Sequence, residues 1–250
     1  MIGRKFKNIA VVSLAVFLFL APHKTEAVNN PKVPILVYHY IARNPNLKDK
    51  ARDSLSVPPD KFETQMEYLS KNGFTPISLD TLYAIFNKQA QAPNKPIVLT
   101  FDDGYIDFAT NAFPILQKFN FPAVEFIATG LVGGSYYMSW DQIKKIQSSG
   151  LVTFEAHTVS HVNLASLSLA AVNKQLQDSK NILQSKTGYP VNFVAYPYGV
   201  SSAAVQMAAR NAGFIGGLGT WYGKAGGPSY SMPRIRVSGF WSIKEFASRL

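Results

Sequence analysis

The chain lacks cysteine altogether and has only four histidines among its 250 residues. The absence of cysteine excludes disulfide bonds, thiolate-bound zinc, iron–sulfur clusters and thiol catalysis. Charged residues are also few, at 16% of the chain, whereas 47% of the residues are hydrophobic and 13% are aromatic. This composition is that of a folded protein, and the length suits one large domain or two small ones. Any metal ion would therefore need histidine, carboxylate or backbone oxygen ligands.

Acidic residues are outnumbered by basic ones, 15 to 25, which gives a formal net charge of +10. The basic residues are scattered and form neither a basic helix nor an RNA-binding motif, so we expect no nucleic-acid partner. An exported basic protein would favour anionic cell surfaces or cell walls, although the charge can equally serve solubility alone. The sequence carries no indication of oligomeric state.

The sequence also lacks a hydrophobic run long enough to span a membrane, but a shorter one stands near its start. Three basic residues precede the uncharged residues 9–20, and residues 25–27 (Thr-Glu-Ala) offer a small-residue cleavage site. A spanning helix needs about 20 apolar residues, whereas this layout is typical of a secretory signal peptide. We expect a signal peptide over residues 1–27, cleaved rather than kept as an anchor, and one domain over residues 28–250. The protein would then be secreted, at the cell surface or periplasmic.

The rest of the chain alternates short apolar runs with helical patterns. The apolar runs, typical of buried parallel strands, are residues 34–38, 96–101, 122–128, 151–156 and 191–196. The helical patterns are residues 60–72, 79–87, 105–119, 139–149, 168–186 and 201–211, and a polar stretch, residues 41–58, is expected to be a long loop. This alternation predicts a parallel α/β fold, whose chemistry lies in the loops after the strands. Periodicity alone leaves open whether the sheet is open or closed into a barrel.

Two adjacent carboxylates stand at the end of one predicted strand, Asp102 and Asp103, followed by Gly104. Adjacent carboxylates repel each other, and burial makes both charges costlier unless a cation lies nearby. A capped turn is the other interpretation, because Asp-Gly is a common turn pair.

Two histidines, His157 and His161, follow another predicted strand at a spacing that lets both imidazoles reach one metal ion on a helical turn. They could also be unrelated, but only His39 remains besides these two once the signal peptide is removed. One Asp and two His would form three ligands with open positions for water or substrate, as in a hydrolytic metal site. The second Asp could then act as general base.

At these motifs the sequence resembles a known family. Residues 100–104 (Thr-Phe-Asp-Asp-Gly) and 157–161 (His-Thr-Val-Ser-His) resemble the first two motifs of the polysaccharide deacetylases, the carbohydrate esterase family with the NodB homology domain. Residues 195–199 (Ala-Tyr-Pro-Tyr-Gly) resemble the third motif, and the likeness extends over roughly residues 33–240.

The resemblance implies a fold and a set of roles. The fold would be a distorted (β/α)7 barrel. Asp103, His157 and His161 would bind the metal, Asp102 would be the general base, and the backbone N–H of Tyr198 would help to hold the oxyanion. Two imidazoles and one carboxylate suit Zn²⁺, and also Co²⁺ or Ni²⁺.

The sequence departs from the family pattern at two positions. Ala195 stands where the third motif usually has an arginine that orients the base, and Arg234 is our candidate replacement, with a surface charge as the other interpretation. The usual acid histidine near the end of the chain is missing, because no histidine follows His161. His39 in residues 34–39 (Pro-Ile-Leu-Val-Tyr-His) resembles the acid of the biofilm poly-β-1,6-N-acetylglucosamine deacetylases, in which the barrel order is circularly permuted. A structural histidine at the end of the first strand is the alternative.

The sequence therefore predicts a secreted metal-dependent N-deacetylase of an N-acetylglucosamine-containing polysaccharide, which hydrolyses a linear amide. Trp140, Trp221 and Tyr222 could stack on sugar rings, although each could instead belong to the core. Alternatives are a deacetylase of O-acetyl xylan or peptidoglycan and a non-catalytic carbohydrate-binding relative. The complete Asp and His set favours an enzyme, whereas the vacant arginine position argues weakly for reduced activity.

Overall fold

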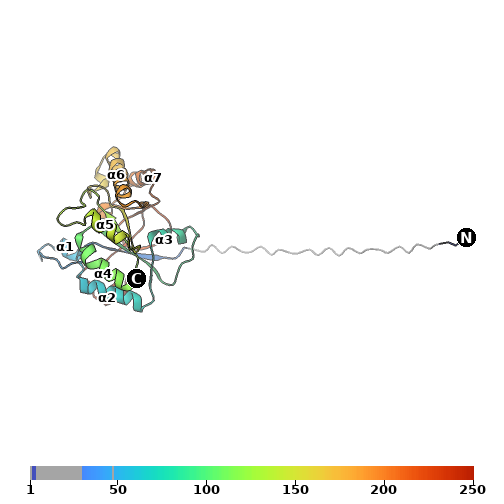
Figure 1. Ribbon diagram of the computed structural model, residues 1–250, viewed down its shortest axis with the longest axis horizontal. Coiled ribbons are helices and arrows are strands. Elements are labelled where there is room, and N and C mark those ends of the chain that lie inside the picture. The colour runs from blue at the N-terminus through green and yellow to red at the C-terminus, as the bar shows by residue number, and fades with distance from the viewer. Residues whose placement is uncertain (1, 4–29, 47) are drawn as a thin grey trace.

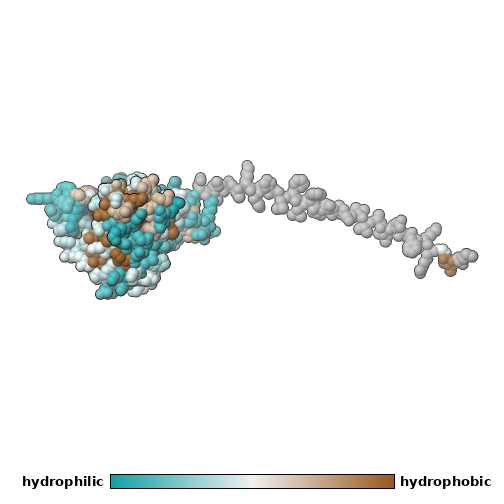
Figure 2. Space-filling view, turned by 90° about the horizontal axis from the view of Figure 1, so that it is seen from above, coloured by the Kyte–Doolittle hydropathy of each residue, from teal (hydrophilic) through white to brown (hydrophobic). Residues whose placement is uncertain are grey.

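A computed structural model describes residues 2–3, 30–46 and 48–250 of the chain. Almost all of the predicted signal peptide, residues 1–27, lies outside the described residues. Among the described residues, no helix has both the length and the apolar character needed to cross a membrane. On the face that Figure 2 shows, hydrophobic residues lie between hydrophilic ones.

The centre of the fold is a curled, mainly parallel sheet (Figure 1). Its main path runs β7-β6-β5-β4-β3-β1-β8, with bounds Gly216–Leu218, Phe193–Ala195, Val152–Ala156, Ala123–Ile127, Pro96–Asp103, Val33–Tyr38 and Lys224–Ala225. The short β2 (Thr75–Pro76) pairs with β3, and β8 pairs antiparallel with β1. Each apolar run predicted as a strand forms one, within a few residues of its predicted ends.

The two ends of the parallel sheet are linked by the segment that leads into β9 (Ile235–Arg236). β9 pairs in parallel with β1, and Met232 bridges to Leu218 of β7. The backbone N–H of Met232 donates to the Gly217 carbonyl at 2.9 Å. The sheet therefore curls into a distorted α/β barrel, as predicted. The circular permutation of that barrel stays a prediction.

Helices surround the curled sheet, with α2 and α4 on one side and α6 and α7 on another (Figure 1). Their bounds are α1 Lys50–Leu55, α2 Pro59–Lys71, α3 Leu79–Phe86, α4 Phe113–Phe119, α5 Trp140–Gln147, α6 Leu169–Thr187, α7 Ala203–Asn211 and α8 Ile243–Ala247. The pattern predicted over residues 105–119 is divided, because a π-helical turn over residues 108–112 precedes α4. 

The predicted long loop over residues 41–58 contains α1, so that prediction was wrong in part. Asp49 caps this helix by accepting a hydrogen bond from the backbone N–H of Arg52. α1 has no buried residue, and it therefore shows no apolar periodicity that a sequence pattern could reveal.

Alternate residues of each strand face opposite sides of the curled sheet. Ile35 of β1, Val98 of β3 and Val124 of β4 belong to one buried cluster, which fills the inside of the sheet. Leu36 and Tyr38 belong to a larger cluster that packs the outside of the sheet against the helices. The same alternation decides which polar side chains reach the inside at the carboxyl ends of the strands.

Candidate active site and metal centre

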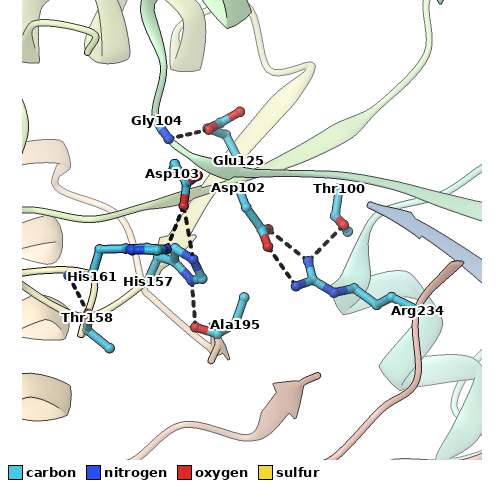
Figure 3. Close-up of polar contacts among 10 residues, drawn as sticks. All are labelled: Thr100, Asp102, Asp103, Gly104, Glu125, His157, Thr158, His161, Ala195 and Arg234. Atoms are coloured by element: carbon cyan, nitrogen blue, oxygen red, sulfur yellow. Dashed lines mark hydrogen bonds and ion pairs between the residues drawn. The ribbon is translucent and has the colours of Figure 1, made fainter. Parts of the chain in front are cut away.

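A cavity of about 600 Å³ opens at the carboxyl ends of the strands, where parallel α/β barrels carry their chemistry. Most of the residues singled out from the sequence line it: His39, Asp102, Asp103, His157, His161, Tyr198, Tyr222 and Arg234. The fold thus brings together side chains that are separated by almost the whole chain. Figure 3 shows the polar contacts at the centre of this group.

Asp103, His157 and His161 converge on one point. Asp103 Oδ1 lies 3.3 Å from His157 Nε2 and 3.0 Å from His161 Nε2. The three potential ligand atoms all lie within 4.8 Å of one another. Asp103 and His157 are buried, whereas His161 is partly exposed and faces the cavity. One imidazole is therefore fixed in the protein and the other borders on solvent.

The two histidines lie on a tight turn, so the predicted helical turn was wrong. Thr158 and His161 have left-handed backbones, with φ of 66° and 51°. The Thr158 hydroxyl accepts from the His161 N–H at 3.1 Å, and Gln175 of α6 accepts from the N–H groups of Val159 and Ser160. These side-chain contacts, rather than helical hydrogen bonds, bring the second imidazole back towards the first.

The hydrogen bonds of His157 show that no proton donor lies between this imidazole and Asp103. Its Nδ1 lies 2.7 Å from the Ala195 carbonyl oxygen (Figure 3). Because a carbonyl only accepts, Nδ1 carries the proton, and a neutral His157 presents the lone pair of Nε2 to Asp103. Asp103 Oδ1 is buried without a well-formed hydrogen bond to any described residue. Electron-rich atoms that lie this close without a proton donor between them are suited to binding a divalent cation. In metal sites a backbone carbonyl often accepts from the other nitrogen of a ligating imidazole, as the Ala195 carbonyl does here.

The pKa shifts agree with this geometry. Burial acts to raise the pKa of Asp103, but the two imidazoles outweigh it and hold that pKa well below its ordinary value. Burial acts to lower the pKa of His157, but the close contact with the Asp103 carboxylate and the charge of Asp102 raise it on balance. The cluster therefore favours a positive charge, whether a proton or a metal ion.

Asp102 makes a different set of contacts, all with protein groups. Its Oδ1 accepts from Arg234 Nη1 at 2.8 Å, and its Oδ2 accepts from Arg234 Nη2 at 2.7 Å. The guanidinium also donates to the Thr100 hydroxyl at 3.1 Å and to the Gly219 carbonyl at 2.7 Å. Burial acts to raise the pKa of Asp102, and Arg234 outweighs it, so that the pKa lies below its ordinary value. Such a paired, two-pronged contact fixes both the charge and the orientation of the carboxylate.

Arg234 thus contacts Asp102, as expected of a residue that replaces the arginine missing at Ala195. It is fully buried, which excludes the alternative of a surface charge. It precedes β9, next to β1, whereas Ala195 belongs to β6. The base-orienting role of the contact stays a prediction.

His39 and Tyr198 border the same cavity. His39 directly follows β1 and is partly exposed. Burial lowers the pKa of His39, and the charges of Asp103 and Asp102 oppose this shift. Tyr198 has a left-handed backbone with φ of 61°, and its ring centroid lies 5.1 Å from that of His161. The acid role of His39 and the oxyanion role of the Tyr198 N–H stay predictions.

The predicted sugar-stacking aromatics divide into two groups. Tyr222 lines the cavity and is 63% exposed. Trp140 and Trp221 are not among the residues that line it, and Trp140 is partly buried against the outer core. Sequence reasoning missed Tyr105, which lines the cavity and stacks on Tyr40 with ring centroids 4.0 Å apart. Its position directly after the Asp-Asp-Gly motif was the signal that could have revealed it.

The chain is similar to known proteins over this fold and site. The family model described as polysaccharide deacetylase matches residues 89–216. The poly-β-1,6-N-acetyl-D-glucosamine N-deacetylase of Staphylococcus aureus (strain MRSA252) is 30% identical over 199 residues, 73% of this chain and 68% of that protein. The Escherichia coli (strain K12) protein of the same name is 34% identical over 130 residues, 45% of this chain and 19% of that protein. The Streptococcus pyogenes deacetylase PplD, solved in complex with acetate, has a TM-score of 0.81 and 29% identity, covering 88% of this chain and 98% of that one.

A curled parallel α/β barrel with a carboxylate–imidazole cluster at the carboxyl ends of its strands defines the class as a barrel-fold hydrolase. Within that class, the chain belongs to the polysaccharide deacetylase family and is a deacetylase. The match of the family model ends before Arg234 and begins after His39. Arg234 directly precedes β9 and His39 directly follows β1, so both reach the site from outside the matched segment.

Proposed function

We propose that the protein is a secreted, metal-dependent deacetylase that removes N-acetyl groups from an N-acetylglucosamine-containing polysaccharide. The observation that carries the proposal is the juxtaposition of two unlike aspartates in one cavity. Asp103 faces two imidazole nitrogens, and Asp102 is held by a buried arginine. Amide hydrolysis needs both an electrophilic centre and a base, and this cavity offers a site for each.

Asp103, His157 and His161 would hold the metal ion, with Zn²⁺ as the first candidate and Co²⁺ or Ni²⁺ as alternatives. A divalent ion in such a site polarises an acyl oxygen and lowers the pKa of water. The protein's own contribution is orientation. The Ala195 carbonyl fixes the His157 ring, and the Thr158 hydroxyl fixes the turn that carries His161.

Asp102 would take the proton from the attacking water. Arg234 occupies one lone pair on each carboxylate oxygen, which leaves the others free to accept. The same arginine keeps Asp102 ionised and prevents its rotation. The attack adds the water oxygen to the acetyl carbon and transfers one water proton to Asp102.

His39 would donate a proton to the leaving nitrogen as the C–N bond breaks, which yields an amine and acetate. Its place in the wall of the cavity that Asp102 also lines fits a proton donor to the leaving group. The Tyr198 N–H would donate to the oxygen that becomes negative during the attack. Both roles rest on the resemblance and on the position of these residues around the cavity.

The substrate class follows from the relatives and from the cavity. Two relatives carry the name poly-β-1,6-N-acetyl-D-glucosamine N-deacetylase. The exposed Tyr222 ring at the cavity wall offers a flat surface against which a sugar ring can stack. We propose secretion because residues 1–27 have the layout of a signal peptide. Without residues 1–27, which hold four basic residues and one acidic residue, the formal net charge is +7, and this charge would favour an anionic cell surface.

The test is acetate release by the full chain from poly-β-1,6-N-acetylglucosamine, with and without a chelator and with Zn²⁺ added back. We expect release that the chelator abolishes and Zn²⁺ restores, and no release by the matched variant Asp102→Asn. Parallel arms contain chitin oligosaccharides, peptidoglycan and acetylated xylan. Faster release from acetylated xylan would show that the preferred substrate is an O-acetyl ester rather than an N-acetyl amide. Release that persists in chelator, or none from any polymer with metal bound, would contradict the proposal.

A further inference from the structure

Glu125 is an acidic residue in the middle of a buried strand. It has no role in the proposed mechanism. It belongs to β4 and is fully buried. Its neighbours on the same face, Ala123 and Ile127, pack in the outer core between sheet and helices. A carboxyl group in such surroundings destabilises the fold unless specific hydrogen bonds compensate for its lost hydration.

One specific hydrogen bond connects this side chain to the metal-binding loop. Glu125 Oε1 accepts from the backbone N–H of Gly104 at 2.8 Å (Figure 3). Glu125 Oε2 is buried and has no partner among the described residues. Burial, with the charge of Asp102 as the next cause, raises the pKa of Glu125 well above its ordinary value. The raised pKa favours the neutral carboxyl group, and Oε1 accepts the hydrogen bond from Gly104 in either protonation state.

The N–H that Glu125 holds belongs to the peptide unit between Asp103 and Gly104. Both residues have left-handed backbones, with φ of 82° and 80°. This conformation is unfavourable for a non-glycine residue such as Asp103, so neighbouring contacts must hold it. The Gly104 carbonyl accepts from the Met138 N–H at 2.9 Å, which fixes the other side of that residue.

The left-handed turn decides where the Asp103 carboxylate points. In a regular strand, Asp102 and Asp103 would face opposite sides of the sheet. Asp102 faces the inside and meets Arg234, whereas the turn at Asp103 lets its carboxylate reach both histidines. The hydrogen bond from Gly104 to Glu125 restrains this turn from the outer face of the sheet.

We propose that Glu125 is a positioning residue that sets the Asp103 carboxylate for metal binding through the Asp103–Gly104 peptide unit. The inference rests on the metal site of the proposed function. We predict that metal affinity and coordination depend on whether residue 125 can accept the hydrogen bond from the Gly104 N–H. They should not depend on the charge of residue 125. Supporting contacts of this kind are typically worth a factor of about 10–100 in metal affinity.

The test measures the Zn²⁺ dissociation constant of the full chain by chelator competition, and the visible absorption of the Co²⁺-loaded protein. The variants are Glu125→Gln, which keeps the acceptor, Glu125→Leu, which removes it, and Glu125→Asp, which is too short to reach Gly104. Leu69→Ala is the control for general destabilisation, because it truncates a fully buried side chain of α2 away from the cavity.

We expect Glu125→Gln to bind Zn²⁺ within about twofold of the wild type. Glu125→Leu and Glu125→Asp should bind at least about tenfold more weakly, with an altered Co²⁺ spectrum. Leu69→Ala should lower the melting temperature and leave both readouts unchanged. If Glu125→Leu fails to fold, Glu125→Asp decides the question.

Wild-type affinity in a folded Glu125→Asp or Glu125→Leu variant would overturn the inference, as would an equal loss of affinity in Leu69→Ala. In either case metal binding by the wild type would leave the proposed function intact. A wild-type chain that binds no Zn²⁺ would instead refute the metal site itself.

Discussion

The two adjacent aspartates, both buried, have opposite surroundings. Asp102 is satisfied by protein groups, because Arg234 supplies a donor to each of its oxygens. Asp103 faces His157 and His161, one of which presents a lone pair rather than a proton. The protein alone supplies the partners of Asp102, whereas the Asp103 half has the geometry of the metal site that we propose. The first half can orient a reactant, and the second half can bind a metal ion.

The largest effect should come from the Asp103 half. We expect His157→Ala to abolish metal binding and turnover, because it removes one of three ligands and the one fixed by the Ala195 carbonyl. Metal content of the purified protein, measured by atomic emission, checks this. The same zinc content as in the wild type would reject the ligand assignment.

In the Asp102 half, Asp102→Asn should keep the metal and lose turnover by about 10²–10⁴-fold, the usual contribution of a general base. Acetate release at saturating substrate measures the loss. Wild-type zinc content in the folded variant would show that the loss is chemical. Near-normal release would remove Asp102 from the role of base.

The ion pair of the same half should also matter for stability. Removing one partner of a buried pair leaves an uncompensated charge, so Arg234→Met should lower the free energy of unfolding by about 3–5 kcal/mol. Urea denaturation measures this, and Asp102→Asn combined with Arg234→Met should cost less than the sum of the single changes. Additive costs would mean that the 2.7 and 2.8 Å contacts contribute nothing in solution.

His39 lies beside both halves and should affect turnover alone. We expect His39→Ala to reduce acetate release by about 10²-fold without loss of zinc, because an acid helps the amine to leave but binds no metal. A substrate with a better leaving group, such as an acetylated aryl amine, should rescue most of the rate. A wild-type rate on the polysaccharide would leave His39 a structural residue.

A third aspartate, Asp107, lies in the helical turn shortly after β3 and gives the smallest expected effect. Asp107 has no cation partner that outweighs burial, and burial raises its pKa from 3.8 to about 6, although the Ile41 N–H opposes this. Because the folded pKa is the higher one, its stabilising effect is complete below about pH 4 and is lost as pH rises through about 6.

The variant Asp107→Asn keeps an acceptor for the Ile41 N–H and removes the titration. Its free energy of unfolding should therefore decline less than that of the wild type between pH 4 and pH 7, by about 2 kcal/mol. Thermal or urea unfolding across this range measures the difference. Parallel pH profiles for the two proteins would contradict the raised pKa.

The fold followed from the sequence because buried parallel strands are continuous apolar runs and the strand ends carry the polar residues. Residues 96–101 and 151–156 were recognisable for this reason, and the motifs that follow them fixed the site. The short strands β7 and β9 were not predicted, since two or three residues, some of them glycine, carry no periodic pattern. α1 escaped notice because no apolar face marks it.

The site was predictable where residues lie close in sequence and less so where the barrel brings distant strands together. His157 and His161 share one short window, but their turn is set by Gln175, sixteen residues from Val159. Arg234 was inferred only from a vacancy at Ala195, and its contact with Asp102 spans 132 residues. Glu125 looked like an ordinary strand residue, because nothing local shows that it bonds to Gly104.

The most direct test of the difference between the two aspartates is the zinc content of Asp102→Asn and Asp103→Asn, prepared and measured in parallel. The two substitutions make the same chemical change at neighbouring residues, and zinc content is compared between folded proteins. We predict one equivalent of zinc in Asp102→Asn and none in Asp103→Asn. Equal zinc content in the two variants would contradict the division of the site into an arginine-held base and a metal ligand.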